Sequence, residues 1–209
     1  MRKKIRLALL VTVLSTLFVL QSSYAYENAE YGFSMDEPAG WNPLPPDEEG
    51  IVVGFVDPNV AVTGAFINVA VHDTGLSLSA YVEGFKQSEV DKYGTIVLES
   101  EGSRTVGGLE GYELVSSHTH AGMGQFTNKQ VIFVENGKGF VVNAGAFSSE
   151  YDNSLGTFEQ TIESFRITID SSDDSGTDLT VVIVAVFAVV VIGAIVVIFF
   201  LRNKQKSEI

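Results

Sequence analysis

Hydrophobic and polar positions divide the chain into two uninterrupted apolar runs, one near each end, and a middle region of shorter, alternating patterns. The first run covers residues 7–20 and the second covers residues 179–201. Neither run contains a charged residue or a polar face. Such runs are typical of segments that enter lipid, whereas a helix on the surface of a soluble domain has one polar side.

The N-terminal run has the pattern of a secretory signal peptide. Basic residues occupy positions 2, 3, 4 and 6, the apolar run follows, and the small residues Ser23 and Ala25 come just before Tyr26. The 14 residues of the run reach only about 21 Å as a helix, which is shorter than the ~30 Å hydrocarbon core of a bilayer. We therefore predict a signal peptide over residues 1–25, with an uncleaved signal anchor as the alternative.

The C-terminal run predicts one transmembrane helix over residues 179–201. Its 23 residues cover about 34 Å as a helix, enough to cross a bilayer. Residues 170–178 are an acidic, polar tether before the run, and residues 202–209 are a basic tail after it. Because basic residues favour the cytoplasmic side, the domain before the helix is expected outside the cell membrane and the C-terminus inside. A buried core helix is the alternative interpretation.

Between these ends, residues 26–169 show the shorter apolar and polar patterns of strands and helices that are expected for one α+β domain. Strands are expected at residues 31–35, 51–56, 65–71, 95–100, 112–119, 131–135 and 138–147. Asn136-Gly137 separates the last two and predicts a type I′ hairpin, since both residues tolerate positive φ. The proline-rich residues 38–46 are expected to form a loop that holds Trp41, and residues 107–111 to form a turn.

Two segments change to the period of a helix. In the first, Leu78, Val82, Phe85 and Glu89 form one stripe, with a serine at 77 or 79 to cap it and Gly94 to end it. The second covers about residues 149–165, where apolar residues recur every three or four positions. This order predicts helices packed on an antiparallel sheet, which is an α+β fold.

The charge of the predicted exported region is strongly negative. Residues 26–178 contain six basic and 25 acidic residues, a net charge of about −19. This balance argues against nucleic acid and against an anionic lipid surface as partners. The chain has no cysteine, so the domain must be stable without disulfides, and 153 residues can bury a sufficient core.

The sequence contains no motif of a known catalytic site, and we assign no catalytic, cofactor-binding or metal-binding residue and no cofactor. His118 and His120 are two positions apart on a predicted strand, so both imidazoles could face one way and chelate zinc or copper if a carboxylate joined them. The alternative is a pair of solvated side chains. Residues 47–49 and 170–178 are acidic enough to suggest calcium, but their spacing is not that of an EF-hand loop. His72 is expected to be a surface or hydrogen-bonded histidine.

The domain resembles the PsbP-like family of extrinsic photosystem II proteins and their bacterial and archaeal relatives. The resemblance rests on residues 31–35 (YGFSM), 38–41 (PAGW), 108–112 (GLEGY) and the closing helix up to Phe165, and it covers residues 31–167. It implies an α/β/α fold, an antiparallel sheet sandwiched by helices. It also implies an accessory or binding role, because most members are not enzymes. No manganese or calcium ligand of the family can be placed on a matching residue.

These observations favour a membrane-anchored, extracytoplasmic binding or accessory module without catalytic activity, with a protein partner in the envelope. Two alternatives stay open. The domain could be a structural component of the envelope or a surface layer. It could also be a metal-dependent hydrolase, which would need His118, His120 and a carboxylate within reach of one metal ion.

Overall fold

The computed structural model describes residues 25–45, 50–120 and 122–168. The predicted signal peptide up to residue 24, the acidic residues 47–49, the tether, the membrane span and the tail lie outside the described residues. Within the described ranges, no helix is long and apolar enough to cross a membrane. Those predictions about the two ends of the chain therefore stay predictions.

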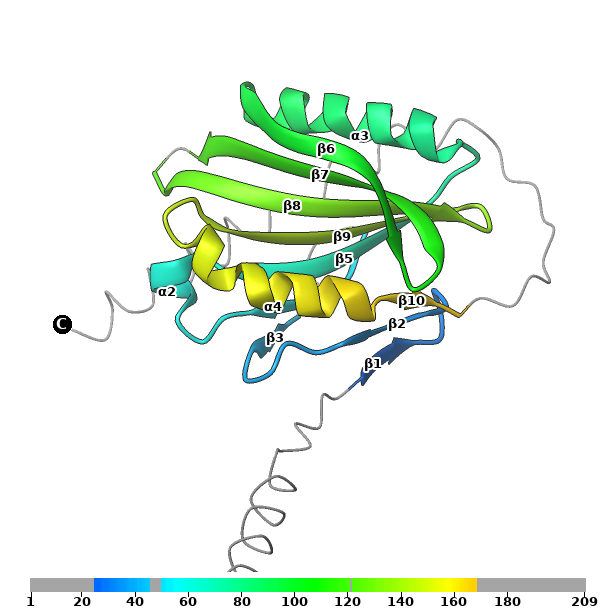
Figure 1. Ribbon diagram of the computed structural model, residues 1–209, viewed down its shortest axis with the longest axis horizontal. Helices are drawn as coiled ribbons and strands as arrows, with labels where there is room; N and C mark the ends of the chain where they lie inside the picture. Colours follow the sequence, from blue (N-terminus) through cyan, green and yellow to red (C-terminus); the bar gives the residue numbers. More distant parts are fainter. Residues whose placement is uncertain (1–24, 46–49, 121, 169–209) are drawn as a thin grey trace, which may run out of the picture.

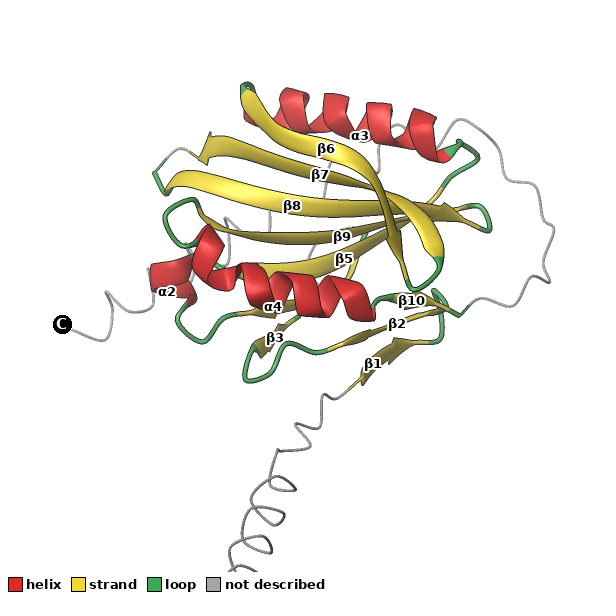
Figure 2. Cartoon of the chain, viewed as in Figure 1, coloured by secondary structure: helices red, strands yellow, loops and turns green. Residues whose placement is uncertain are grey.

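A seven-stranded antiparallel sheet forms the centre of the domain (Figures 1 and 2). From one edge to the other its strands are β3 (Asn42–Leu44), β4 (Ile51–Val56), β5 (Phe66–Asp73), β9 (Lys138–Phe147), β8 (Gly124–Glu135), β7 (Leu109–His120) and β6 (Ile96–Val106). The last four are consecutive in sequence and are joined by tight turns. β3 and β6 are the two edges of this sheet.

The two faces of the large sheet are covered by different elements. Helix α4 (Tyr151–Ser164) and a small antiparallel sheet of β1 (Ala25–Asn28), β2 (Phe33–Asp36) and β10 (Arg166–Ile167) pack on one face. Helix α3 (Leu78–Tyr93) packs on the other, and the one-turn helix α2 (Val60–Thr63) follows β4 (Figure 1). The α/β/α arrangement that the resemblance implied is confirmed for the described domain.

Aromatic side chains dominate the larger core, which lies between the sheet and α4. The ring of Phe165, fully buried, lies 5.3 Å from Phe133, 5.5 Å from Phe33 and 6.1 Å from Phe140, measured between ring centroids. Trp41 is half-buried and packs edge-to-face on Phe158. Residues from β2, from the large sheet and from α4 with its C-cap therefore meet in one cluster, and this cluster fixes α4 against the sheet.

The predicted helix signals are confirmed in α3. Ser77 is the N-cap, where its side chain accepts a hydrogen bond from the backbone N–H of Ala80 at 3.4 Å. Gly94 ends the helix at a φ of 75°. The predicted stripe faces the sheet, with Val82, Phe85 and Glu89 buried and Leu78 half-buried. The hairpin prediction also holds, since Asn136 and Gly137 both have positive φ.

The structure corrects several element boundaries. The region predicted as a proline-rich loop contains β3, and Pro43 is tolerated there because β3 is an edge strand. The turn predicted at 107–111 is only Gly107-Gly108, because β7 already begins at Leu109. β8 begins at Gly124, seven residues before the expected start. The short elements β1, β10 and α2 carry too few residues for a periodic pattern and were not predicted.

Candidate functional site

A row of carboxamide side chains crosses the α3 face of the sheet. Asn68 on β5 is paired with Asn143 on β9, and Asn143 is paired with Gln130 on β8. Asn128 lies two residues before Gln130 and therefore on the same face. All four side chains are buried, with 0–1% of their surface exposed. The antiparallel register thus brings together polar residues that are far apart in sequence.

Most of the hydrogen-bonding capacity of this row is unused. The Nδ2 and Oδ1 atoms of Asn68 and Asn143, and the Oδ1 atom of Asn128, are buried without a hydrogen-bond partner in the structure. A buried polar group left unpaired costs about 1–3 kcal/mol, so native proteins rarely leave several together. We define these three asparagines as the asparagine row. It is the described part of the α3 face that most needs an additional polar partner.

Glu89 reaches the edge of the asparagine row from helix α3. The Nε2 atom of Gln130 donates to the Oε2 atom of Glu89 at 3.3 Å, and Glu89 is only 4% exposed. Burial raises the pKa of Glu89 to about 7, against the opposing effects of Lys92 and of the hydrogen bond from Gln130. Burial therefore favours the protonated, uncharged form of this carboxyl group well above the pH at which an exposed glutamate ionises.

His118 borders the row on strand β7. Its Nδ1 atom is 3.4 Å from the Nδ2 atom of Asn128, and its ring stacks on Tyr93 at a centroid distance of 3.8 Å. Burial, and then the positive charges of His120 and Lys92, lower the pKa of His118 to about 4. His118 is therefore uncharged at neutral pH. Together with the carboxamides, it makes the surroundings of the row polar.

Within the described ranges, no third ligand joins His118 and His120 in the metal site that the sequence left open. His118 and His120 do lie on the same face of β7, but the ring of His118 is buried in its stack with Tyr93. Among the described residues, no three His, Cys, Asp or Glu side chains are placed to hold a metal ion. His72 is buried rather than at the surface, with its Nδ1 atom 3.1 Å from the hydroxyl of Tyr81. The prediction that His72 is hydrogen-bonded is confirmed.

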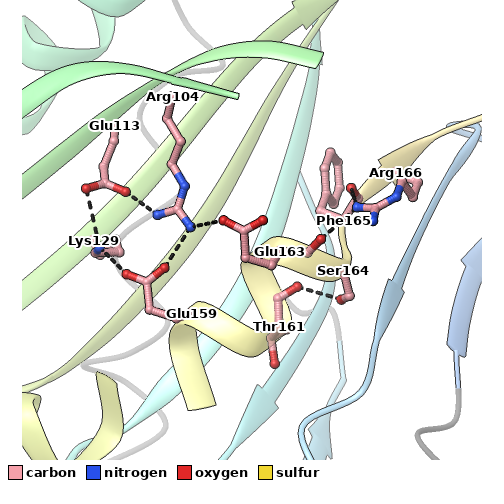
Figure 3. Close-up of polar contacts among 9 residues, drawn as sticks. All are labelled: Arg104, Glu113, Lys129, Glu159, Thr161, Glu163, Ser164, Phe165 and Arg166. Carbon is pink, nitrogen blue, oxygen red and sulfur yellow. Dashed lines mark hydrogen bonds and ion pairs between the residues drawn. The ribbon is translucent and has the colours of Figure 1, made fainter. Parts of the chain in front are cut away.

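An ion-pair network on the opposite face joins the sheet to α4 (Figure 3). Arg104 contacts Glu113 on β7, Glu159 at 2.7 Å and Glu163 at 2.6 Å, and Lys129 bridges Glu113 and Glu159. Partial burial alone would lower the pKa of Arg104, but the three carboxylates hold it above its usual range. Since the network pairs its charges internally, its role is to position α4.

A third feature is a set of exposed apolar side chains at the end of α3 and at the start of the edge strand β6. Val90 near the end of α3, and Val97 and Leu98 at the start of β6, are 39%, 56% and 44% exposed. Val62 on α2 is the fourth large apolar side chain of this exposure among the described residues. We call Val90, Val97 and Leu98 the β6 patch, although Val97 and Leu98 are consecutive in β6 and therefore point to opposite faces of the sheet. Among the described strands, β6 pairs only with β7, so no described strand lies along its other backbone edge (Figure 1).

Analysis of the sequence missed both the asparagine row and the β6 patch. The signal for the row was present, because Asn68, Asn143 and the pair Asn128 and Gln130 interrupt otherwise apolar strand faces. What the sequence lacks is the register that brings them together. The β6 patch lies where α3 ends and β6 begins. Neither the helical nor the strand pattern of the sequence predicts that apolar side chains of both elements are exposed there.

These features define an α/β/α protein with a meandering antiparallel sheet, a polar row on one face and no described catalytic cluster. The family model described as PsbP matches residues 21–167, and the chain belongs to the PsbP family. Domains of this family are often non-catalytic accessory or binding modules. No match was found among curated proteins.

Two solved structures show the same fold. One is the cyanobacterial PsbP (CyanoP) of Synechocystis sp. PCC 6803, with a TM-score of 0.55 and 15% identity, covering 69% of this chain and 91% of that protein. The other is LpqN of Mycobacterium tuberculosis, described as involved in cell envelope biogenesis, with a TM-score of 0.50 and 21% identity, covering 70% of this chain and 90% of that protein. At these identities the similarity shows the fold alone.

Proposed function

We propose that the chain is a membrane-anchored, extracytoplasmic accessory module that binds a protein partner of the envelope and has no catalytic activity. Its family supports the accessory role. The predicted signal peptide at residues 1–25 and the predicted span at residues 179–201 support the location. LpqN, which shares the fold, is described as involved in cell envelope biogenesis, and this favours an envelope setting.

The β6 patch is the observation that carries the proposal of a protein partner. Three exposed apolar side chains fall within nine residues, beside an edge strand of 11 residues. An open edge strand offers unpaired backbone N–H and C=O groups, and a partner can bind by adding a strand to it. Glu99, which follows Leu98, is acidic, whereas Glu101 is already paired with Lys86. The proposed partner therefore contributes an extended segment with apolar side chains and a basic side chain opposite Glu99.

The test is co-purification of the full-length, tagged chain from its native membranes, followed by mass spectrometry. One variant carries Val97→Lys and Leu98→Lys. The matched control carries Val62→Lys, because Val62 is also exposed, at 70%, but lies on α2. We expect one envelope protein to co-purify with the wild type and the control, and to be lost from the double variant.

Equal recovery of that partner with all three proteins would contradict the role of the β6 patch. Recovery of no specific envelope protein with the wild type would contradict the accessory role itself. Turnover of a substrate by the purified full-length chain would contradict the absence of catalysis.

A further inference from the structure

The second half of helix α3 packs on the sheet through a carboxyl group. In the first half of the helix, Val82 and Phe85 are 2% and 1% exposed and belong to the smaller core. One helical turn after Phe85, Glu89 takes the same inward position and is 4% exposed. Its Oε2 atom accepts a hydrogen bond from the Nε2 atom of Gln130 on β8. The contact of this half of α3 with the sheet therefore depends on a group that can carry a charge.

The lysines of α3 do not compensate for the burial of Glu89. Lys92 favours the ionised carboxylate, but burial has the larger effect and raises the pKa of Glu89 to about 7. Lys86 contacts Glu83 on the helix and Glu101 on β6. An ionised Glu89 in this position would be a buried charge whose lost hydration Lys92 replaces only in part, which is unfavourable.

The strands under this half of α3 present Gln130 from β8, and His118 and His120 from β7. Burial, and then the positive charges of His120 and a neighbouring lysine, lower the pKa of His118 to about 4. At neutral pH both Gln130 and His118 are therefore uncharged. The contact that the described sheet makes with Glu89 is a hydrogen bond rather than an ion pair.

The end of α3 leads directly into the β6 patch. The helix ends at Gly94, where φ is 75° and an added Cβ would meet nothing within 4 Å. β6 begins two residues later, at Ile96. Val90 of the patch follows Glu89 directly, and the other two residues of the patch are the second and third of β6. A movement of the last turns of α3 about Gly94 therefore carries Val90 away from the rest of the patch.

We propose that the proton on the Glu89 side chain controls whether the last two turns of α3 lie on the sheet, and through them the form of the β6 patch. With the proton bound, the carboxyl group is neutral and stays buried. Once the proton is lost, hydration of the carboxylate favours release of these turns from the sheet.

The direction of the pH dependence follows from burial. Because burial raises the pKa of Glu89, the docked state of α3 is stable below about pH 7 and becomes less stable as the pH rises through that value. The consequence for partner binding rests on the proposed function, whereas the movement of α3 does not.

Hydrogen exchange of the full-length chain in micelles, measured by mass spectrometry, tests the movement. The wild type and Glu89→Gln are compared at pH 5.5 and 8, in the same buffers, so that the chemical exchange step is equal for both proteins. One pH unit above the pKa, ionisation multiplies the open population about tenfold. At pH 8 we therefore expect peptides covering residues 86–98 to exchange about tenfold faster in the wild type than in Glu89→Gln. At pH 5.5 the two proteins should agree, and peptides from α4 should agree at both pH values.

Two further variants separate the effect of Glu89 from other effects of charge and shape. Glu110→Gln is the matched control, because Glu110 is exposed on β7 and its replacement removes the same charge. It should exchange like the wild type. Glu89→Met carries no ionisable group, so the protection of its residues 86–98, corrected for the chemical step, should not change with pH.

Co-purification from native membranes at pH 6 and pH 8 tests the consequence for the β6 patch. We expect the wild type to recover less of its partner at pH 8 than at pH 6, and Glu89→Gln to recover equal amounts at both. If neither protein recovers a partner at either pH, the proposed function fails, and hydrogen exchange alone decides the movement of α3.

The proposal is overturned if residues 86–98 exchange equally fast in the wild type and in Glu89→Gln at pH 8. It is also overturned if peptides from α4 accelerate as much as residues 86–98, since Glu89 would then act only on unfolding of the whole domain. Recovery of a partner that does not change with pH in the wild type would contradict control of the β6 patch.

Discussion

Replacing Glu89 by glutamine is expected to stabilise the domain at alkaline pH and to leave it almost unchanged at acidic pH. Glu89 is 4% exposed, and burial raises its pKa from 4.5 to about 7. The Nε2 atom of Gln130 donates a hydrogen bond to its Oε2 atom at 3.3 Å, and the side-chain oxygen of a glutamine can accept the same bond. The substitution therefore removes the ionisation and keeps the shape.

The direction of the effect follows from proton binding. Between pH 4.5 and 7 the folded state retains the proton of Glu89 while the unfolded state loses it, so stability falls as the pH rises through this window. This increase in the pKa of Glu89 corresponds to a loss of about 3 kcal/mol in the free energy of unfolding, and the loss is complete above pH 7. Glu89→Gln avoids this loss. The free energy of unfolding of Glu89→Gln should therefore exceed that of the wild type by up to about 3 kcal/mol at pH 8 and equal it at pH 4.5.

The assay is urea unfolding of the full-length chain in micelles, followed by Trp41 fluorescence at pH 4.5, 6 and 8. Glu110→Gln is the control, because Glu110 is exposed on β7 and its replacement changes the net charge by the same amount. The reasoning is refuted if Glu89→Gln is less stable than the wild type at pH 8. A stability difference that does not change with pH would refute it equally.

Three further substitutions test the packing of α4 and α3. Arg104→Met leaves the carboxylates of Glu113, Glu159 and Glu163 without their shared guanidinium, and urea unfolding should show a loss of about 1–3 kcal/mol that shrinks in 1 M salt. Phe165→Ala opens a cavity among buried rings, with an expected loss of about 3–5 kcal/mol. Gly139→Ala places a Cβ 2.5 Å from the ring of Tyr81, and should lower the stability by about 1–3 kcal/mol and the thermal midpoint accordingly.

Each of these has a contrary outcome. A loss for Arg104→Met that is independent of salt would mean that packing, not charge, holds α4. A loss below about 1 kcal/mol for Phe165→Ala would place Phe165 outside the cooperative core. Gly156→Ala is the control for Gly139→Ala, since an added Cβ at Gly156 meets nothing within 4 Å. Equal effects of the two would show that the contact with Tyr81 is not limiting.

The sequence predicts those elements whose signal is local. The stripe of α3 ends at Gly94, and the Asn136-Gly137 turn joins two apolar strands, so periodicity and turn chemistry were sufficient there. β8 was expected seven residues too short, because its first half carries Asn128, Lys129 and Gln130, which are polar but buried. Burial of polar residues depends on contacts between distant strands, and no window of sequence contains those contacts.

The candidate site was harder to predict for the same reason. The residues of the asparagine row come from β5, β8 and β9, and only the register Asn68–Asn143–Gln130 makes them neighbours. The histidines were easy to notice because few residue types bind metals. In the structure the ring of His118 stacks on Tyr93 instead. Residue type suggested the chemistry, while the fold determined which groups share a face.

The location of the domain is the central claim, and labelling of single cysteines tests it most directly. The chain has no natural cysteine, so Asn153→Cys on the domain and Ser207→Cys in the tail each give one reactive thiol. Intact spheroplasts expressing either full-length variant are treated with a membrane-impermeant maleimide, before or after permeabilisation. The account predicts labelling of Asn153→Cys in intact spheroplasts, labelling of Ser207→Cys only after permeabilisation, and both proteins in the membrane fraction. Protection of Asn153→Cys in intact spheroplasts, or recovery of the full-length chain in the soluble cytosol, would contradict it.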